Sequence, residues 1–160
     1  MRISSKDSID LFVKALAERK PSPGGGAAAA LGGALGAALI VKVANFTIGK
    51  KKYKRHEKEA RSIAKKAAAL RDKLNAHIEK DVRAYGEYAR TRSRASLKKA
   101  AACVAEIARL SKEAVSLCAA LKKIGNSNLK GDIYAAGLLL KASERSAANL
   151  VKLNKKRMGC

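Results

Sequence analysis

Large aromatic side chains are scarce in this sequence. It contains no tryptophan, and aromatic residues make up 4% of the 160 residues, whereas alanine is abundant. A core without bulky aromatic rings must be thin and closely packed, which suits helices better than sheets. No stretch predicts a convincing strand, and the length suits one domain over residues 1–160 with a substantial core.

Acidic residues are also few. The chain has 13 Asp and Glu against 35 Lys and Arg, and its net charge is +22. Such an excess attracts polyanions, whether nucleic acid, anionic lipid or a polyglutamylated cofactor. The charge alone does not distinguish between these partners.

Cysteine is limited to Cys103, Cys118 and Cys160. The first two fall on one predicted helix, about 22 Å apart at 1.5 Å per residue, which is too far for a disulfide. The spacing fits neither a disulfide framework nor a metal site, so we expect no metal and a reducing, cytoplasmic location. The N-terminal sequence MRISSKDSIDLF has no apolar signal region.

Glycine and alanine dominate the stretch from Pro21 to Tyr53, PSPGGGAAAALGGALGAALIVKVANFTIGKKKY. A Pro-Gly turn opens into a helix that closes around Gly49 and is followed by three lysines. Glycine inside a helix costs about 1 kcal/mol relative to alanine, so its retention suggests that another backbone or a flat ligand approaches closely. The turn can also present backbone N–H groups to an anion or a ring, although a tightly packed central helix is an equally plain explanation.

The apolar run in this helix, Ala27 to Val41, does not predict a membrane span. It is short, consists mostly of alanine and glycine, and is followed by Lys42. A spanning helix needs about 20 strongly apolar residues. We therefore expect a buried helix in a water-soluble protein with no membrane partner.

A long helix is predicted from about Tyr53 to Arg92, and one of its faces carries two unexpected residues. The apolar stripe runs through Ile63, Ala67, Leu70, Leu74, His77, Asp81, Ala84 and Tyr88. His77 and Asp81 lie one turn apart on this buried face. A carboxylate there either finds hydrogen-bond donors or has a raised pKa, as a general acid or base near neutral pH requires. A purely structural aspartate remains the alternative.

Three further helices complete the prediction. The first is capped by Ser4 or Ser5, carries an apolar stripe of Ile9, Phe12, Val13 and Leu16, and ends before Pro21. The fourth ends near Ile124, and the last runs from about Leu129 to Lys155 with Asp132 in its first turn, where a carboxylate favours the helix dipole. The fold class is therefore all-α, an antiparallel bundle of about five helices that includes one Gly/Ala-rich buried helix and one long helix.

Three motifs resemble a known family. PSPGGG with the small-residue helix and VANFTIGKKKY, then Asp81-Val82-Arg83-Ala84-Tyr85, then Gly125-Asn126-Ser127-Asn128 followed by Asp132, are similar to segments of the cyclodeaminase/cyclohydrolase family. The resemblance covers nearly the whole chain. It implies a homodimer with a ligand cleft near the subunit interface and chemistry on tetrahydrofolate derivatives, with no prosthetic group.

The resemblance also implies site residues. Asp81 would shuttle a proton, with Asp132 and His77 as further catalytic candidates and Asn128 assisting or orienting. Substrate-binding candidates are Pro23, Gly24, Gly25, Gly26, Asn45, Lys50, Lys51, Lys52 and Asn128. The three lysines would receive the glutamate tail of a folate, although their place at a helix C-terminus explains them equally well.

Two reactions fit this resemblance and one alternative stands beside them. A cyclohydrolase opens 5,10-methenyltetrahydrofolate with water, and a cyclodeaminase closes 5-formiminotetrahydrofolate with loss of ammonia. The alternative is a non-catalytic basic helical protein of the same fold that binds nucleic acid or another polyanion. It is favoured by the charge of +22 and by Ala27 and Gly131, where the family carries small polar residues.

Overall fold

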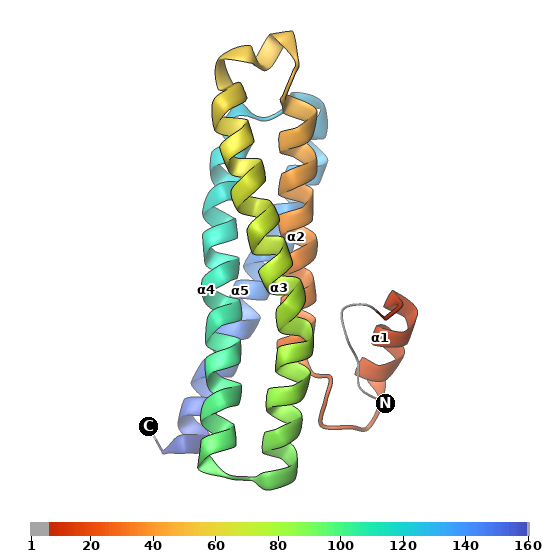
Figure 1. Cartoon of the computed structure of the whole chain (residues 1–160), viewed down its shortest axis with the longest axis vertical. Coiled ribbons are helices and arrows are strands. Elements are labelled where there is room, and N and C mark those ends of the chain that lie inside the picture. The colour runs from red at the N-terminus through yellow and green to blue at the C-terminus, as the bar shows by residue number, and fades with distance from the viewer. Residues whose placement is uncertain (1–6, 160) are drawn as a thin grey trace.

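The structure, a computed structural model, describes residues 7–159, and all its regular elements in that range are helices (Figure 1). They are α1 (Ile9–Ala17), α2 (Gly25–Thr47), the 3-10 helix η1 (Lys51–His56), α3 (Glu57–Thr91), α4 (Arg94–Ile124), the 3-10 helix η2 (Ser127–Leu129) and α5 (Lys130–Met158). The all-α prediction is confirmed. The predicted helix ends agree with the observed ends to within a few residues, except that the predicted start of the long helix is a separate 3-10 helix, η1.

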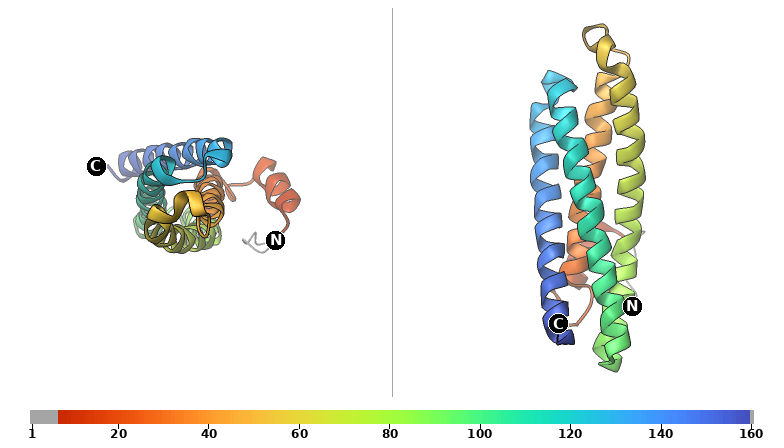
Figure 2. Two further views of the ribbon diagram at one scale, coloured as in Figure 1. Left: turned by 90° about the horizontal axis from the view of Figure 1, so that it is seen from above. Right: turned by 90° about the vertical axis from the view of Figure 1, so that its left-hand side faces the viewer.

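The four long helices α2 to α5 run up and down in alternation around one core, and α1 lies beside them (Figures 1 and 2). Phe12 and Ala15 are buried, whereas Ile9 and Val13 are exposed, so only part of the predicted stripe on α1 faces the protein. The N-cap of α1 is Ser8, whose Oγ accepts a hydrogen bond from the Leu11 N–H. The predicted caps Ser4 and Ser5 lie outside the described residues.

Glycines on α2 allow its neighbours to come close. A Cβ added at Gly36 would lie 2.6 Å from Leu140 Cγ, and one at Gly33 would lie 2.8 Å from Ser143 Oγ. Ser143 Oγ also donates a 2.6 Å hydrogen bond to the carbonyl of Ala29. By length and composition α2 could cross a membrane, but here it is the core helix that packs on α3, α4 and α5.

The bundle has two ends. At one end, which we call the Asp81 end, α2 begins, the α3–α4 turn lies and α5 finishes (Figure 1). At the other, the η1 end, α2 passes into η1 and α4 passes through η2 into α5. The 23 residues of α2 separate these ends by about 33 Å at 1.5 Å per residue.

Candidate functional site

The turn before α2 is held against α3 beside Asp81. Ser22 Oγ donates a 3.0 Å hydrogen bond to the carbonyl of Val82, and the Ser22-Pro23 peptide bond is cis. The turn leads into the first residues of α2, where a Cβ at Gly26 would fall on the Asp81 carboxylate. Only glycine at this position leaves room for the carboxylate against the helix backbone.

Asp81 is buried, with 5% of its surface exposed. Burial disfavours the charged carboxylate and raises the pKa of Asp81 to about 6 from the ordinary 3.8. The backbone N–H of Ala27 donates a hydrogen bond to the carboxylate and lowers the pKa, but this contribution is smaller than that of burial. Asp81 can therefore accept and release a proton near neutral pH.

A cavity of about 200 Å³ lies over this carboxyl group, and we call it the Asp81 cavity. Its walls come from the turn before α2 and from α3, α4 and α5. They include Pro21, Gly24, Gly25, Gly26, Asp81, Tyr85, Ala100, Val104, Leu150, Leu153, Asn154 and Arg157. The volume is below the roughly 300–1,000 Å³ of complete small-molecule pockets, so the cavity can hold only part of a drug-sized ligand.

Three polar residues of this cavity, Tyr85, Asn154 and Arg157, were not predicted as site residues from the sequence. Tyr85 follows Asp81 by one turn of α3, and its hydroxyl accepts a 3.4 Å hydrogen bond from Arg157 Nη1. Asn154 is polar but only 4% exposed, because it lies on the buried stripe of α5, seven residues after the buried Ala147. A polar residue at that point of an apolar stripe was the signal that could have found it.

Two predicted residues lie near this cavity without lining it. His77 is buried, as predicted, but its Nδ1 lies 2.8 Å from the carbonyl oxygen of Lys73 on the same helix. Pro23 is buried inside the turn. Cys103 lies on α4 near Asp81. Burial, followed by the negative charge of Asp81, raises the pKa of its thiol to about 12, so the thiol stays protonated.

The remaining predicted residues lie at the η1 end. Lys50, Lys51, Lys52 and Asn128 share a cavity of about 490 Å³ with Phe46, Tyr53, Asn126 and Leu129, which we call the triple-lysine cavity. Asp132 also lies at this end, where its Oδ1 accepts a 3.0 Å hydrogen bond from Lys42 Nζ on α2. Asn45 is exposed on α2. Within one chain these residues therefore lie at the opposite end of α2 from the Asp81 cavity.

No three His, Cys, Asp or Glu side chains among residues 7–159 are grouped so that they could hold a metal ion. The chemistry that the Asp81 cavity offers is proton transfer at one carboxyl group, beside an amide, a phenol and a guanidinium. The backbone of Gly24 to Gly26 supplies the opposite wall.

Comparisons with known proteins identify the family of the chain. The sequence model of the formiminotransferase-cyclodeaminase family matches residues 8–159. The chain is 35% identical to the methenyltetrahydrofolate cyclohydrolase of Methylorubrum extorquens, with 96% of this chain and 82% of that protein covered. It is 32% identical to the formimidoyltransferase-cyclodeaminase of Gallus gallus, over 50% of this chain and 15% of that protein.

A solved structure gives the same result. The crystal structure of formiminotetrahydrofolate cyclodeaminase from Thermotoga maritima matches this fold with a TM-score of 0.89 and 32% sequence identity. The match covers 94% of this chain and 79% of that one. By its sequence over residues 8–159 and by its fold, the chain belongs to the formiminotransferase-cyclodeaminase family.

Proposed function

We propose that the protein is a folate one-carbon enzyme that acts at the methenyl carbon of tetrahydrofolate derivatives, as a methenyltetrahydrofolate cyclohydrolase or a formiminotetrahydrofolate cyclodeaminase. The relatives that carry these names match nearly the whole chain. The observation that carries the proposal is the Asp81 carboxyl group, which is buried beside glycine backbone in a cavity and has a pKa of about 6.

In the cyclohydrolase reaction, a water oxygen bonds to the methenyl carbon between N5 and N10, and Asp81 accepts a proton from that water. The tetrahedral carbon then opens as its bond to N5 breaks. Asp81 returns the proton to N5 while the hydroxyl proton leaves to solvent, which yields 10-formyltetrahydrofolate. A carboxyl group with a pKa near the working pH suits both halves of this transfer.

The cyclodeaminase reaction uses the same relay on different atoms. N10 bonds to the carbon of the protonated formimino group, whose nitrogen becomes an NH2 group, and N10 gives its own proton to Asp81. The carboxyl group then delivers that proton to the departing nitrogen, so that ammonia leaves and the methenyl ring closes. Asp81 acts first as base and then as acid.

The other groups of the Asp81 cavity have supporting roles in this proposal. The backbone of Gly24 to Gly26 lets a flat ring approach the α2 terminus, because no side chain stands there. Asn154 and Tyr85 offer hydrogen bonds to ring heteroatoms, and Arg157 provides positive charge at the rim. His77, bonded within its own helix, is a positioning residue for the turn that carries Asp81.

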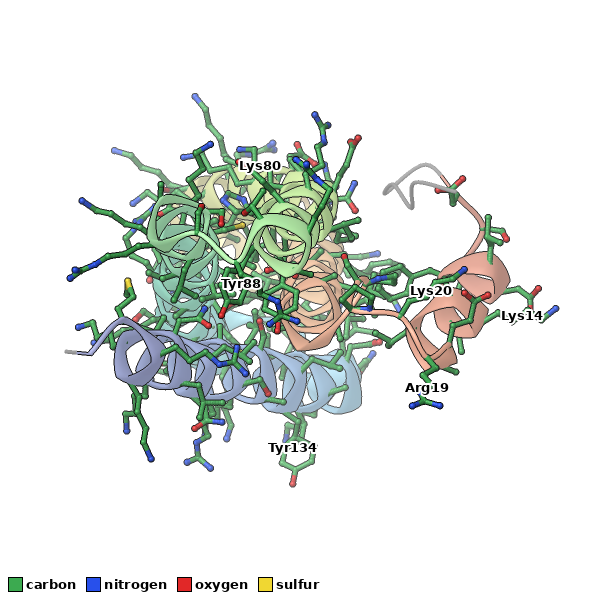
Figure 3. The ribbon with its side chains drawn as sticks, turned by 90° about the horizontal axis from the view of Figure 1, so that it is seen from below. Lys14, Arg19, Lys20, Lys80, Tyr88 and Tyr134 are labelled. Atoms are coloured by element: carbon green, nitrogen blue, oxygen red, sulfur yellow. The ribbon has the colours of Figure 1, made fainter. Side chains whose placement is uncertain are left out.

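We infer that the protein acts as a homodimer in which the partner's η1 end completes the Asp81 cavity. Exposed apolar side chains mark the outer face of α2 and α5, namely Leu35, Phe46 (52% exposed) and Leu138. Tyr134, one turn before Leu138, also points away from the bundle (Figure 3), but it lines a different cavity at the η1 end. A groove of about 380 Å³, lined by small residues such as Ala28, Gly32 and Ala142, runs between these helices.

A twofold axis across the middle of α2 would explain why the predicted residues fall at two ends. It would place the partner's triple-lysine cavity beside the Asp81 cavity, and the lysines could then meet the glutamate carboxylates of a folate whose ring lies near Asp81. In the same arrangement Asn128 and the Asp132–Lys42 pair would come from the partner chain. Nonspecific attraction of nucleic acid by the net charge of +22 would be a side effect that salt removes.

The experiment follows the absorbance of 5,10-methenyltetrahydrofolate with the wild type, with Asp81→Asn and without protein. Asp72→Asn is the matched control, because that aspartate lies on the same helix with its side chain exposed. General acid–base catalysis contributes about 10²–10⁴-fold, so we expect a loss of that size in Asp81→Asn alone.

Two outcomes would count against the proposal. A folded Asp81→Asn protein that loses less than about tenfold would remove the carboxyl group from the mechanism. Failure of the wild type to accelerate either methenyl hydrolysis or ammonia release from 5-formiminotetrahydrofolate would favour a basic binding protein that has kept the fold without the reaction.

A further inference from the structure

A cavity larger than the one over Asp81 lies elsewhere in the described part of the chain. It has a volume of about 690 Å³ and lies at the η1 end, between η1, the end of α4 and the start of α5. We call it the basic cavity. Of the predicted site residues only Lys52 lines it, so its size and chemistry are unexplained by the reaction proposed above.

The charge of the basic cavity has one sign. Five cationic side chains line it, those of Lys52, Arg55, Lys122, Lys123 and Lys130, and no Asp or Glu does. None of the five forms an ion pair with another residue in the range 7–159. The two acidic residues next to the lining in sequence, Glu57 and Asp132, lie outside it and are paired with Arg61 and Lys42.

The floor of the same cavity is apolar and its rim is aromatic. Val43, Leu121 and Ile133 lie at its base, and each is buried in the bundle core. Tyr53 and Tyr134 stand at its sides, with Tyr134 largely exposed. A ligand that fills the cavity therefore needs an apolar or aromatic body as well as negative charge.

The wall formed by η1 is fixed in place. The Tyr53 hydroxyl accepts a 2.9 Å hydrogen bond from the Ser127 N–H and lies 3.0 Å from Ser127 Oγ, which ties η1 to η2. Lys52, Tyr53 and Asn126 also line the triple-lysine cavity, so the two cavities are neighbours. The cavity is thus shaped before any ligand enters, which lowers the cost of binding.

The number of charges decides the class of ligand. A single carboxylate would leave most of the five cations uncompensated in one small space, whereas a chain of phosphate groups supplies three or four charges close together. The Arg55 guanidinium suits phosphate oxygens, and so does the start of α5, where Lys130 and Gly131 line the cavity and no side chain caps the helix.

We propose that the basic cavity binds a nucleoside polyphosphate, with the phosphates on the lysines and Arg55 and the base against Tyr134 and the apolar floor. This site is separate from the Asp81 cavity. Its ligand would contact Lys52 and Tyr53, which also line the triple-lysine cavity, so a bound nucleotide would alter the region proposed to receive the folate tail.

The test is calorimetric titration of the wild type with ATP, adenosine, inorganic tripolyphosphate and tri-γ-glutamate in about 0.15 M salt, where the Debye length is about 8 Å. Lys122→Gln/Lys123→Gln is compared with Lys65→Gln/Lys66→Gln, an exposed lysine pair on α3 that lies outside the cavity. We expect one ATP per chain, weakened about tenfold or more by the first double variant and unchanged by the second. Tyr134→Ala should weaken ATP binding and leave tripolyphosphate binding unaffected.

Other results would overturn the proposal. An equal loss of ATP affinity in the two lysine double variants would show that ATP is bound by general attraction to the net charge. Tighter binding of tri-γ-glutamate than of ATP would assign the cavity to polycarboxylates, and absence of ATP binding would leave the cavity without this role. Because the readout is binding alone, none of these outcomes depends on the enzyme activity.

Discussion

Asp81 is the one buried carboxylate among residues 7–159, and the stability of an Asp81→Asn variant relative to the wild type should increase as pH rises through 6. An unfolded chain ionises this group near the ordinary pKa of 3.8, whereas the folded protein keeps its pKa at about 6. Stability from Asp81 is therefore fully present below pH 3.8 and is lost as pH rises to the folded pKa. At 1.4 kcal/mol per tenfold difference in proton affinity, the loss approaches about 3 kcal/mol.

The measurement is urea unfolding followed by far-ultraviolet circular dichroism, for the wild type and Asp81→Asn, at several pH values between about 4 and 8. The difference in unfolding free energy between the two proteins should move by roughly 2–3 kcal/mol in favour of the variant across this range. Any constant cost of burying the amide cancels in that change. Urea is preferred to guanidinium chloride because the latter would screen charges.

Asp72→Asn serves as the matched control, since its side chain is 67% exposed. Its difference from the wild type should lack the shift of roughly 2–3 kcal/mol, because folding leaves this side chain in water. If the Asp81→Asn difference is also flat, or moves toward the wild type as pH rises, the burial argument fails. The raised pKa of Asp81 would then no longer support its proposed role in proton transfer.

Four further predictions test other parts of the structure. The rate of methenyl hydrolysis should rise with pH through about 6, because ionised Asp81 is the base, and a pH–rate profile of kcat/KM checks this. Gly26→Ala should lower activity at least tenfold, because its Cβ would displace the Asp81 carboxylate; a variant with unaltered kcat and KM would contradict the close approach. Gly36→Ala should lower the unfolding free energy by about 1–3 kcal/mol through overpacking against Leu140, as urea unfolding would show. An equal mixture of Asp81→Asn and a Lys51→Ala/Lys52→Ala variant, refolded together, should regain about a quarter of wild-type activity if sites are shared between chains, and none if they are not.

The sequence predicted the helices because their patterns are local and strong. The stripe on α3 is buried from Ile63 to Asp81, and the glycines of α2 do face close neighbours. The position of α1 outside the bundle was not predictable, since its stripe of apolar residues is typical of a helix that packs inside one. The 3-10 form of η1 also lacks a clear signal, because its lysine-rich sequence fits a helix end equally well.

The candidate site was predicted only in part. Asp81 and Gly24 to Gly26 share a cavity, but they are joined there by Asn154 and Arg157, which come from the far end of the chain. Only the packing of α5 against α2 brings them together, and the spacing of these residues in the sequence does not predict that packing. The catalytic role of Asp81 is a prediction that the experiments above test, and those of His77 and Asp132 remain predictions.

The helix α2 links events at the two ends of the molecule. Its first turn donates to the Asp81 carboxylate, and its end passes into the lysines of η1. Because Gly33 and Gly36 fix the depth at which it sits among α3, α4 and α5, a side chain added at its middle would shift both ends at once. Substitutions remote from either cavity could therefore change proton transfer and anion binding together, and variants in the middle of α2 are the place to look for that effect.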